Sequence, residues 1–438
     1  MKKIALFFLC LTQCYADPVI LGGTYGSGET PLIDTFSTPG LAASSVAIPV
    51  GNTGSIYSVA MGVDGSSVLG GETDDGKPLA YKVLAGSGIA TPITGMTTNV
   101  GYINDVAIGP DGTVIMVGTN YTSGVALIYR VNAGSTEAIS ITPPTVTGIH
   151  LDAVAIGPDG TAIMGGYSSE GVCIIYLAPG AMSATSVGLP SSAVGRILSI
   201  AIDSHGTAII GGATGMIDTA TPLYWLPQGA STATFITSSY SASINGVAIG
   251  SNGTAIAGGQ SIEDDNPIIY QILAGSTVAT TVSGITSYRG EINGVAIGPD
   301  GTAVAVGGNQ NSHLPVVYRI TSAGGGEATN VSIPSGISGG SFLSVAIDSA
   351  ETAILGGIDR SEGKSQIPLI CILGSTDTVA TRIANPNANQ GRINSVATSS
   401  IYSNDPIPPE GLYNIDRIRP IYEAELYETK NKLHQAGL

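Results

Sequence analysis

The stretch "VAIGPDGTAIMGG" at residues 154–166 is a nearly unchanged copy of "VAIGPDGTVIMVG" at residues 106–118. Self-similarity at a fixed period of roughly 40–50 residues indicates an array of small units, none of which can bury its apolar face alone. The chain is therefore predicted to form one repeat domain, although its length alone would suggest about two or three domains. Aligned on the first residue of the apolar triplet, the copies begin at Val59, Val106, Val154, Ile200, Val247, Val295, Val345 and Val396, with spacings of 46 to 51 residues.

One unit contains four short strand patterns. Residues 295–298 alternate bulky and small side chains, and Pro299-Asp300-Gly301 then favours a turn, because proline presets φ and glycine accepts positive φ. A second apolar run ends in paired glycines at 307–308, and residues 314–320 and 328–334 have the composition of a third and a fourth strand. Four short strands in a unit of this length are typical of a β-propeller blade, so the sequence predicts an all-β fold.

The second-strand glycine signal recurs eight times, which predicts an eight-bladed β-propeller of four-stranded blades. Residues 19–23 have the second-strand pattern with no first strand before them, and residues 393–398 have a first-strand pattern with no second strand after them. Each end carries the strand that the other lacks. We therefore predict a ring that closes by pairing the N-terminal strands with a C-terminal first strand, because closure hides the strand edges.

Both ends of the sequence carry segments outside the repeat. Residues 1–16 contain two lysines, an apolar run and a small final residue, the layout of a signal peptide cleaved before Asp17. This predicts an exported protein, located in the periplasm, on the outer surface or outside the cell. Lipid attachment at Cys14 is a second interpretation of the same segment. The propeller is expected over residues 17–402, and residues 403–438 are expected to be a linker and a short helical tail. No other segment reaches the about 18 apolar residues of a membrane span.

The composition excludes some partners. The formal net charge is −16, and it becomes −18 when Lys2 and Lys3 are removed with the signal peptide. Such an excess of acidic groups disfavours nucleic acid and anionic membranes as partners. The remaining cysteines, Cys173 and Cys371, lie in third strands four units apart. They are too distant for a disulfide and are expected to be buried small hydrophobic residues.

The repeat resembles the HAF-type extracellular repeat of secreted bacterial propellers. The shared pattern is an "IN" dipeptide, a glycine-ended second strand and a third strand with an aromatic residue, although Trp225 is the only tryptophan and the family's histidine is missing. The resemblance covers about residues 17–402. It implies an exported propeller and no known activity. The third-strand aromatic residues are Tyr81, Tyr129, Tyr176, Tyr224, Tyr270 and Tyr318.

Candidate binding residues stand four positions before each repeat anchor. The loops that follow the second and fourth strands vary between units, whereas the turns that follow the first and third strands barely change, so the variable face is the better candidate for recognition. The eight residues at the start of the first strands should ring the mouth of the central channel, although they can also be exposed positions that drift. Five of them have aromatic or charged side chains and are the predicted ligand-binding residues, namely Tyr102, His150, Arg196, Glu291 and Arg392; the others are Ser55, Ser243 and Ser341.

No stretch of the sequence indicates catalysis, a metal or a cofactor. Gly336-Ile337-Ser338-Gly339-Gly340 matches a nucleophile elbow but lacks the strand-turn-helix context. The turn aspartates are replaced by Asn252 and His205 in other units, which a turn tolerates and a calcium site does not. The sequence therefore predicts a binding or interaction module for an unknown protein or glycan partner. The alternatives are a propeller lyase or glycan-active hydrolase with its site at the channel mouth, and a structural envelope component.

Overall fold

The computed structural model describes residues 17–24, 31–38, 42–49, 51, 53–97, 100–190, 195–213, 221–286, 288–321, 326–361, 366–385 and 391–399. The expected signal peptide and the expected helical tail lie outside the described residues. The described residues belong to one compact unit, Met1–Ile401. They form strands, turns and loops without any helix, so the prediction of an all-β fold is confirmed. In this part of the chain there is accordingly no helix that could span a membrane.

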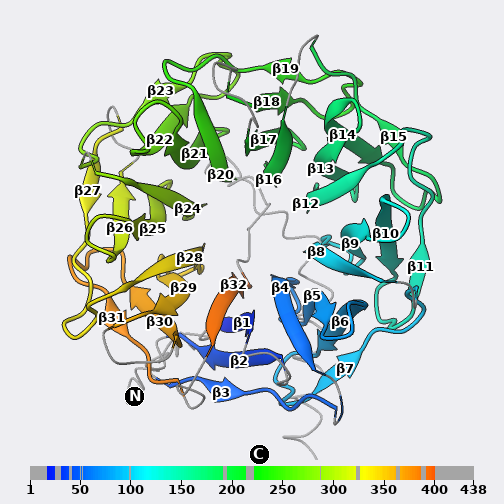
Figure 1. Ribbon diagram of the computed structural model, residues 1–438, viewed down its shortest axis with the longest axis horizontal. Coiled ribbons are helices and arrows are strands. Elements are labelled where there is room, and N and C mark those ends of the chain that lie inside the picture. The colour runs from blue at the N-terminus through cyan, green and yellow to red at the C-terminus, as the bar shows by residue number, and fades with distance from the viewer. Residues whose placement is uncertain are drawn as a thin grey trace, which may run out of the picture. The chain divides into compact units, whose positions relative to one another are not determined.

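The strands form antiparallel sheets that are arranged around a central axis (Figure 1). The strands nearest the axis, here called the inner strands, are β4 (Gly54–Met61), β8 (Gly101–Ile108), β12 (His150–Ile156), β16 (Arg196–Ile202), β20 (Ala242–Ile249), β24 (Gly290–Ile297), β28 (Gly340–Ile347) and β32 (Arg392–Thr398). The second strands are β1 (Pro18–Thr24), β5 (Ser67–Thr73), β9 (Val114–Asn120), β13 (Ala162–Ser168), β17 (Ala208–Ala213), β21 (Ala255–Ser261), β25 (Ala303–Asn309) and β29 (Ala353–Asp359).

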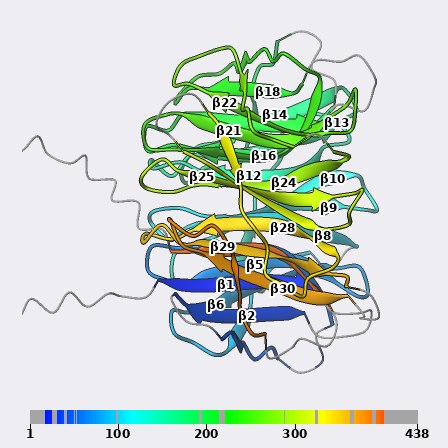
Figure 2. The same ribbon diagram turned by 90° about the vertical axis from the view of Figure 1, so that its left-hand side faces the viewer.

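Shorter strands complete each sheet toward the outside. The third strands are β2 (Leu32–Ser37), β6 (Pro78–Val83), β10 (Val125–Val131), β14 (Gly171–Leu177), β18 (Leu223–Leu226), β22 (Pro267–Ile272), β26 (Pro315–Ile320) and β30 (Ile367–Leu373). The outer strands are β3 (Ser44–Ser45), β7 (Ala90–Pro92), β11 (Ala138–Ser140), β15 (Thr185–Ser186), β19 (Thr234–Phe235), β23 (Thr280–Thr281), β27 (Ala328–Asn330) and β31 (Thr381–Arg382). The turns and loops between strands lie on two opposite faces (Figure 2).

Among the described residues there are six separate four-stranded sheets, and β1–β7 form a larger sheet together with β32. The larger sheet consists of two four-stranded halves that share one residue pair, Thr24 and Ser55. Four-stranded antiparallel units are therefore confirmed. The strands from the two ends of the sequence lie in the same sheet, because β1 pairs with β32 from Val19–Thr398 to Thr24–Arg392.

The glycines of the repeat permit close packing within and between sheets. A side chain on Gly70 would overlap Ile103 and Val106 of the next inner strand, so the first glycine of the pair admits the apolar residues of the neighbouring sheet. A side chain on Gly71 would overlap the carbonyl oxygen of Ser55 in its own sheet. That carbonyl approaches because β4 carries a β-bulge just after it, and equivalent register shifts occur in the other inner strands.

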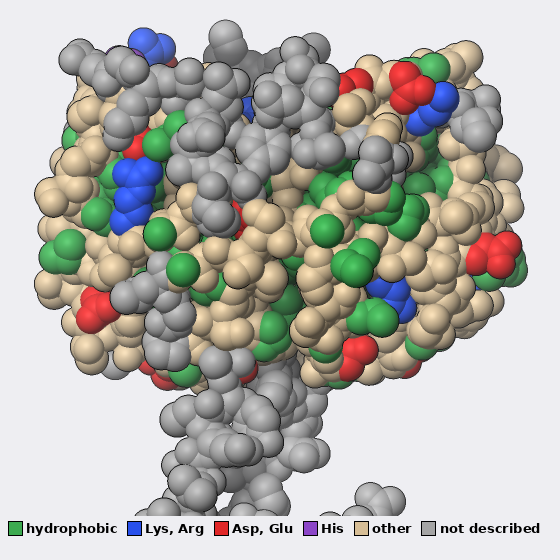
Figure 3. All heavy atoms as spheres, turned by 90° about the horizontal axis from the view of Figure 1, so that it is seen from below, with side chains coloured by type: hydrophobic (Ala, Val, Ile, Leu, Met, Phe, Trp, Pro, Cys, Tyr) green, Lys and Arg blue, Asp and Glu red, His purple; other side chains and the backbone are tan. Residues whose placement is uncertain are grey.

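Polar side chains join neighbouring sheets. At the bulge, Asn245 donates from Nδ2 to the carbonyl of Ile292 in the next inner strand at 3.0 Å. Near the opposite face, the indole nitrogen of Trp225 donates to the carbonyl of Ser276 at 2.6 Å, which explains the only tryptophan in the sequence. Each of these bonds gives a backbone carbonyl a side-chain partner in the neighbouring sheet. Elsewhere the rim seen in Figure 3 is mostly uncharged, as expected for a chain with 11% charged residues.

Candidate functional site

The five predicted ligand-binding residues all lie at the first or second position of an inner strand. Tyr102, His150 and Arg196 begin the consecutive strands β8, β12 and β16, and Arg392 begins β32, which is two inner strands before β8 around the axis (Figure 1). Glu291 begins β24, across the axis from β8. The structure therefore places four of the five residues along one half of the circle of inner strands, with Arg392 and Arg196 at its two ends across the axis from each other, and Glu291 in the other half.

The backbone fixes each of these positions. The carbonyl oxygen of His150 fills the space that a side chain on Gly166 would need, as for Ser55 and Gly71. The glycine before Tyr102 is also held, because the amide of Gly101 donates to the carbonyl of Gly76 at 2.7 Å. Gly76 belongs to the loop between β5 and β6 of the preceding sheet, so a variable loop determines where the next inner strand begins.

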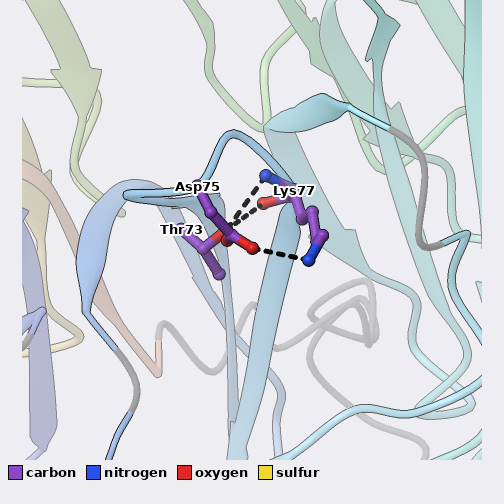
Figure 4. Close-up of polar contacts among 3 residues, drawn as sticks. All are labelled: Thr73, Asp75 and Lys77. Atoms are coloured by element: carbon purple, nitrogen blue, oxygen red, sulfur yellow. Dashed lines mark hydrogen bonds and ion pairs between the residues drawn. The ribbon is translucent and has the colours of Figure 1, made fainter.

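The loop containing Gly76 is braced by its own side chains (Figure 4). Lys77 Nζ lies 2.5 Å from Asp75 Oδ2, and Thr73 Oγ1 donates to Asp75 Oδ1 and accepts from the Lys77 amide at 2.9 Å. These bonds hold the pKa of Asp75 below its usual value. The contact with Lys77 lowers the pKa most, and the bond from the Thr73 hydroxyl has the second largest effect. The acidic pair Asp74-Asp75 is thus part of a turn whose own side chains bind Asp75.

Three tyrosines cluster around a carboxylate beside this loop. The ring centroids of Tyr57 and Tyr102 are 6.3 Å apart in an edge-to-face arrangement, and those of Tyr102 and Tyr121 are 4.9 Å apart. The Tyr57 hydroxyl donates to Glu72 Oε2 at 2.8 Å. Tyr121 is 54% exposed, so the cluster presents aromatic surface to solvent. Aromatic side chains with both an apolar face and a polar tip are frequent at binding surfaces.

There is a second group of contacting rings, which consists of one histidine and one tyrosine. The imidazole of His150 lies parallel to the ring of Tyr167, with centroids 4.5 Å apart and planes 2° apart. This pair lies one sheet further around the axis than Tyr102 and Tyr121. We call the five residues Tyr57, Tyr102, Tyr121, His150 and Tyr167 the aromatic arc.

The aromatic arc lies between two arginines. Burial raises the pKa of Tyr57 most, and the bond to Glu72 raises it further. The positive charge of Arg392 opposes this rise. Burial also raises the pKa of Tyr167, and there the charge of Arg196 opposes it. Each arginine therefore acts on a ring at its own end of the arc. Both arginines are exposed at the surface.

The partly buried carboxyl group of Asp152 follows His150 by two residues at this end of the aromatic arc. Burial raises the pKa of Asp152, and the charges of Arg196 and His150 oppose that rise. Asp152 Oδ1 accepts a hydrogen bond from Asn104 Nδ2 at 3.0 Å, whereas its Oδ2 is buried and has no hydrogen-bond partner. Asparagine occupies this bulge position in other sheets and donates to the next inner strand, as Asn245 does. A carboxyl group can make the same bond only when it is protonated.

The opposite side of the axis differs. The inner strands β20, β24 and β28 begin with Ser243, Glu291 and Ser341 and have no aromatic residue at these positions. Glu291 is half-buried, and burial raises its pKa. Within the described ranges, acidic, cysteine and histidine side chains nowhere form a group of three or more that could hold a metal ion.

Sequence reasoning did not find Tyr57, Glu72, Tyr121 or Tyr167. Tyr57 is the bulge residue of β4, two positions beyond the predicted column, and the other three lie at the ends of second strands. One signal in the sequence could have indicated them: at the end of the second strand, where a variable loop begins, some units have a tyrosine where other units have a small residue. That comparison requires the strand register, which the repeat spacing alone does not provide.

The turn aspartates lie away from the aromatic arc and have the expected role. Asp159 Oδ1 accepts from the amide of Thr161 at 3.0 Å, and Asn252 accepts from Thr254 in the same way at 2.9 Å. Because an asparagine makes the same bond, the carboxylate charge is not needed at this position. The interpretation of these residues as turn formers is confirmed.

A scan against protein-family models finds no match, and a search of the curated proteins finds no relative. Among solved structures, the chain is similar to the propeller of Dos1, with 11% identity, 84% of this chain and 92% of that chain covered, and a TM-score of 0.60. It is also similar to hydrazine synthase of Kuenenia stuttgartiensis, with 14% identity, 75% and 97% covered, and a TM-score of 0.52. At such identities the likeness shows the fold alone: the chain is a β-propeller.

Proposed function

We propose that this protein is an exported, closed eight-bladed β-propeller that recognises a partner through the aromatic arc. One observation carries the proposal: five rings from three neighbouring sheets form two groups of ring contacts on one half of the propeller, whereas the opposite inner strands begin with two serines and a glutamate. Exposed tyrosine also occurs elsewhere, as at Tyr240, but three of the four ring contacts among the described residues lie in this arc. Their concentration favours a shared ligand.

The pairing at the ends of the sequence supports ring closure. β32 occupies the inner place beside β1, so the sheet that contains the N-terminal strands is completed by the C-terminal one. The outer rim supports the same view, because parallel bridges link consecutive outer segments from Ala47–Ile89 to Ser332–Val379, and Ala42–Ala384 links the last to the first. A closed ring provides the rigid support that a preorganised binding surface needs.

The export proposal rests on the signal-like residues 1–16 and on the resemblance to secreted bacterial repeats. The two remaining cysteines are free, so the fold does not depend on an oxidising compartment. The partner is proposed to be a protein or a glycan outside the cytoplasm. Recognition without catalysis is favoured, because Glu72, the carboxylate in the tyrosine cluster, is already bound by the Tyr57 hydroxyl.

A binding screen tests this function. The protein without residues 1–16 is applied to a glycan array and used in pull-downs from its own extracellular medium, together with a variant carrying Tyr102→Ala and Tyr121→Ala. Tyr240→Ala is the matched control, because Tyr240 is a 49% exposed tyrosine outside the arc. We expect the double variant to lose partners that the wild type and the control retain. Equal binding by all three proteins would refute the proposal, and chemical change of a bound glycan would favour the enzyme.

A further inference from the structure

The two arginines at the ends of the aromatic arc are free cations in an acidic protein. Among the described residues, neither Arg196 nor Arg392 takes part in an ion pair or a side-chain hydrogen bond. Some other exposed cations are paired, as Arg289 is with Asp265 at 2.7 Å. The chain has a formal net charge of −16, yet among the described residues no acidic side chain forms an ion pair with either of these two guanidinium groups.

Exposed guanidinium groups recognise carboxylates through two parallel hydrogen bonds. Arg392 and Arg196 begin inner strands on opposite sides of the axis, and the aromatic arc lies on the sheets between them, so a single extended ligand that follows the arc can meet both of them and the rings between. Its carboxylates must be separated by a segment that packs on aromatic faces. The two arginines and the rings together therefore favour a ligand that has both carboxylates and a segment able to pack on aromatic faces.

We propose that the aromatic arc binds an acidic polysaccharide, a chain of sugar rings that carry carboxylates. The proposal rests on the function inferred above and specifies its ligand. The C–H groups on the face of a sugar ring are weakly positive and apolar, which complements the negative face of a tyrosine ring. Sugar hydroxyls donate hydrogen bonds, and the Glu72 carboxylate beside Tyr57 accepts them in addition to the Tyr57 bond.

An acidic peptide fits the same surface less well. Its carboxylates would suit Arg196 and Arg392, but it would offer few hydrogen-bond donors to Glu72, whereas a sugar chain offers many hydroxyl groups. A neutral polysaccharide would use the rings and Glu72 but would leave both arginines without partners. Only a ligand with sugar rings, hydroxyls and carboxylates uses every part of the site.

Titration calorimetry with three defined probes tests the ligand class. The probes are a galacturonate hexamer, maltohexaose as a neutral chain, and a hexaglutamate peptide. The variants are Arg196→Gln with Arg392→Gln, and Arg360→Gln as the matched control, since Arg360 is an exposed arginine on another strand end without an ion pair. All three residues are at the surface, so each variant should unfold at the same urea concentration as the wild type.

We expect the wild type to bind the galacturonate hexamer more tightly than either other probe. The double variant should weaken that binding by at least about tenfold, a loss of one charge-assisted contact or more, while the control stays within about twofold. Absence of hexamer binding, equal binding of maltohexaose, tighter binding of the peptide, or an unaffected double variant would each overturn the proposal.

The outcome also separates this proposal from the binding function. If the hexamer fails but another ligand is bound and is lost in the Tyr102→Ala and Tyr121→Ala variant, the ligand class is wrong and the aromatic arc remains a binding site. If that tyrosine variant retains every ligand that the wild type binds, both proposals fail.

Discussion

The ring of His150 lies parallel to the ring of Tyr167, its partner across the β12–β13 pair, with 4.5 Å between the centroids. The two residues are register partners just before the bulge of β12, and the His150 carbonyl oxygen occupies the space that a side chain on Gly166 would need. Gly166 is therefore needed both for the second strand of the repeat and for the backbone position of His150 in the candidate site.

Gly166→Ala should destabilise the fold, because the new methyl group would overlap the His150 carbonyl, which is backbone and cannot move alone. The expected loss is about 2 kcal/mol or more of unfolding free energy, measured by urea denaturation. Gly88→Ala is the control, since nothing lies within 4 Å of the position of its added carbon. That variant should change stability by less than about 0.5 kcal/mol. Equal effects at both positions would contradict the close-approach argument.

Asp105 should make stability depend on pH. It takes the place that Ser199 has in β16, and it accepts hydrogen bonds from the Ser58 hydroxyl at 2.6 Å and from the Val106 and Val154 amides. Burial nevertheless raises the pKa of Asp105 from 3.8 to about 6. A raised folded pKa favours the protonated group, so its stabilisation is present below about pH 4 and is lost as pH rises through about 6.

Asp105→Ser should remove this dependence. At pH 8 the serine variant should be more stable than the wild type, by at most about 3 kcal/mol, because two pKa units correspond to that limit. Below pH 4 the two proteins should be nearly equal. Urea midpoints measured from pH 4 to pH 8 check the slope. A serine variant that is less stable than the wild type at pH 8 would show that the carboxylate is favoured in the fold.

Ring closure is tested by removing β32. One chain ends after residue 390 and a matched chain ends after residue 399, so both lack residues 400–438 and only the first lacks β32. Without β32, the edges of β1 and the neighbouring inner strands would be exposed, and the Asn394 bond to the Ile56 carbonyl at 2.6 Å would be lost. We expect aggregation or a broad, early thermal transition for the shorter chain alone. Identical sharp transitions for both chains would argue against closure.

The two cysteines should be inert in the folded protein. Cys173 and Cys371 are free and buried, and burial raises the thiol pKa to about 11 and about 12, respectively. In the chain without residues 1–16, a thiol reagent at pH 8 should label neither residue before denaturation and both afterwards. Rapid labelling in the native state would show that a third strand opens, and a disulfide between them would contradict their separation.

The sequence determines much of the fold because its signals are local. Turn formers such as Pro299 and Asp300 act within a few residues, and the double glycines mark where sheets approach. The pairing of β1 with β32 was also predictable, because complementary fragments at the two ends leave one simple partner for each edge.

The candidate site was predictable only in part. Tyr102, His150, Arg196 and Arg392 were found because they share one column of the repeat, and that column also included Glu291 on the far side of the axis. Tyr57 and Tyr167 were missed because their proximity to the column arises from a bulge and from cross-strand pairing. Repeat spacing contains neither relationship, since both depend on which residues face each other after folding.

A crystal structure of the protein with its tightest ligand from the binding screen would show whether the aromatic arc is the binding site. We expect the ligand to pack on the rings of Tyr102 and Tyr121 and to extend toward Arg196 or Arg392. A ligand bound instead on the opposite face, for example in the small crevice lined by Asn252, Gln271 and Thr321, would contradict this expectation.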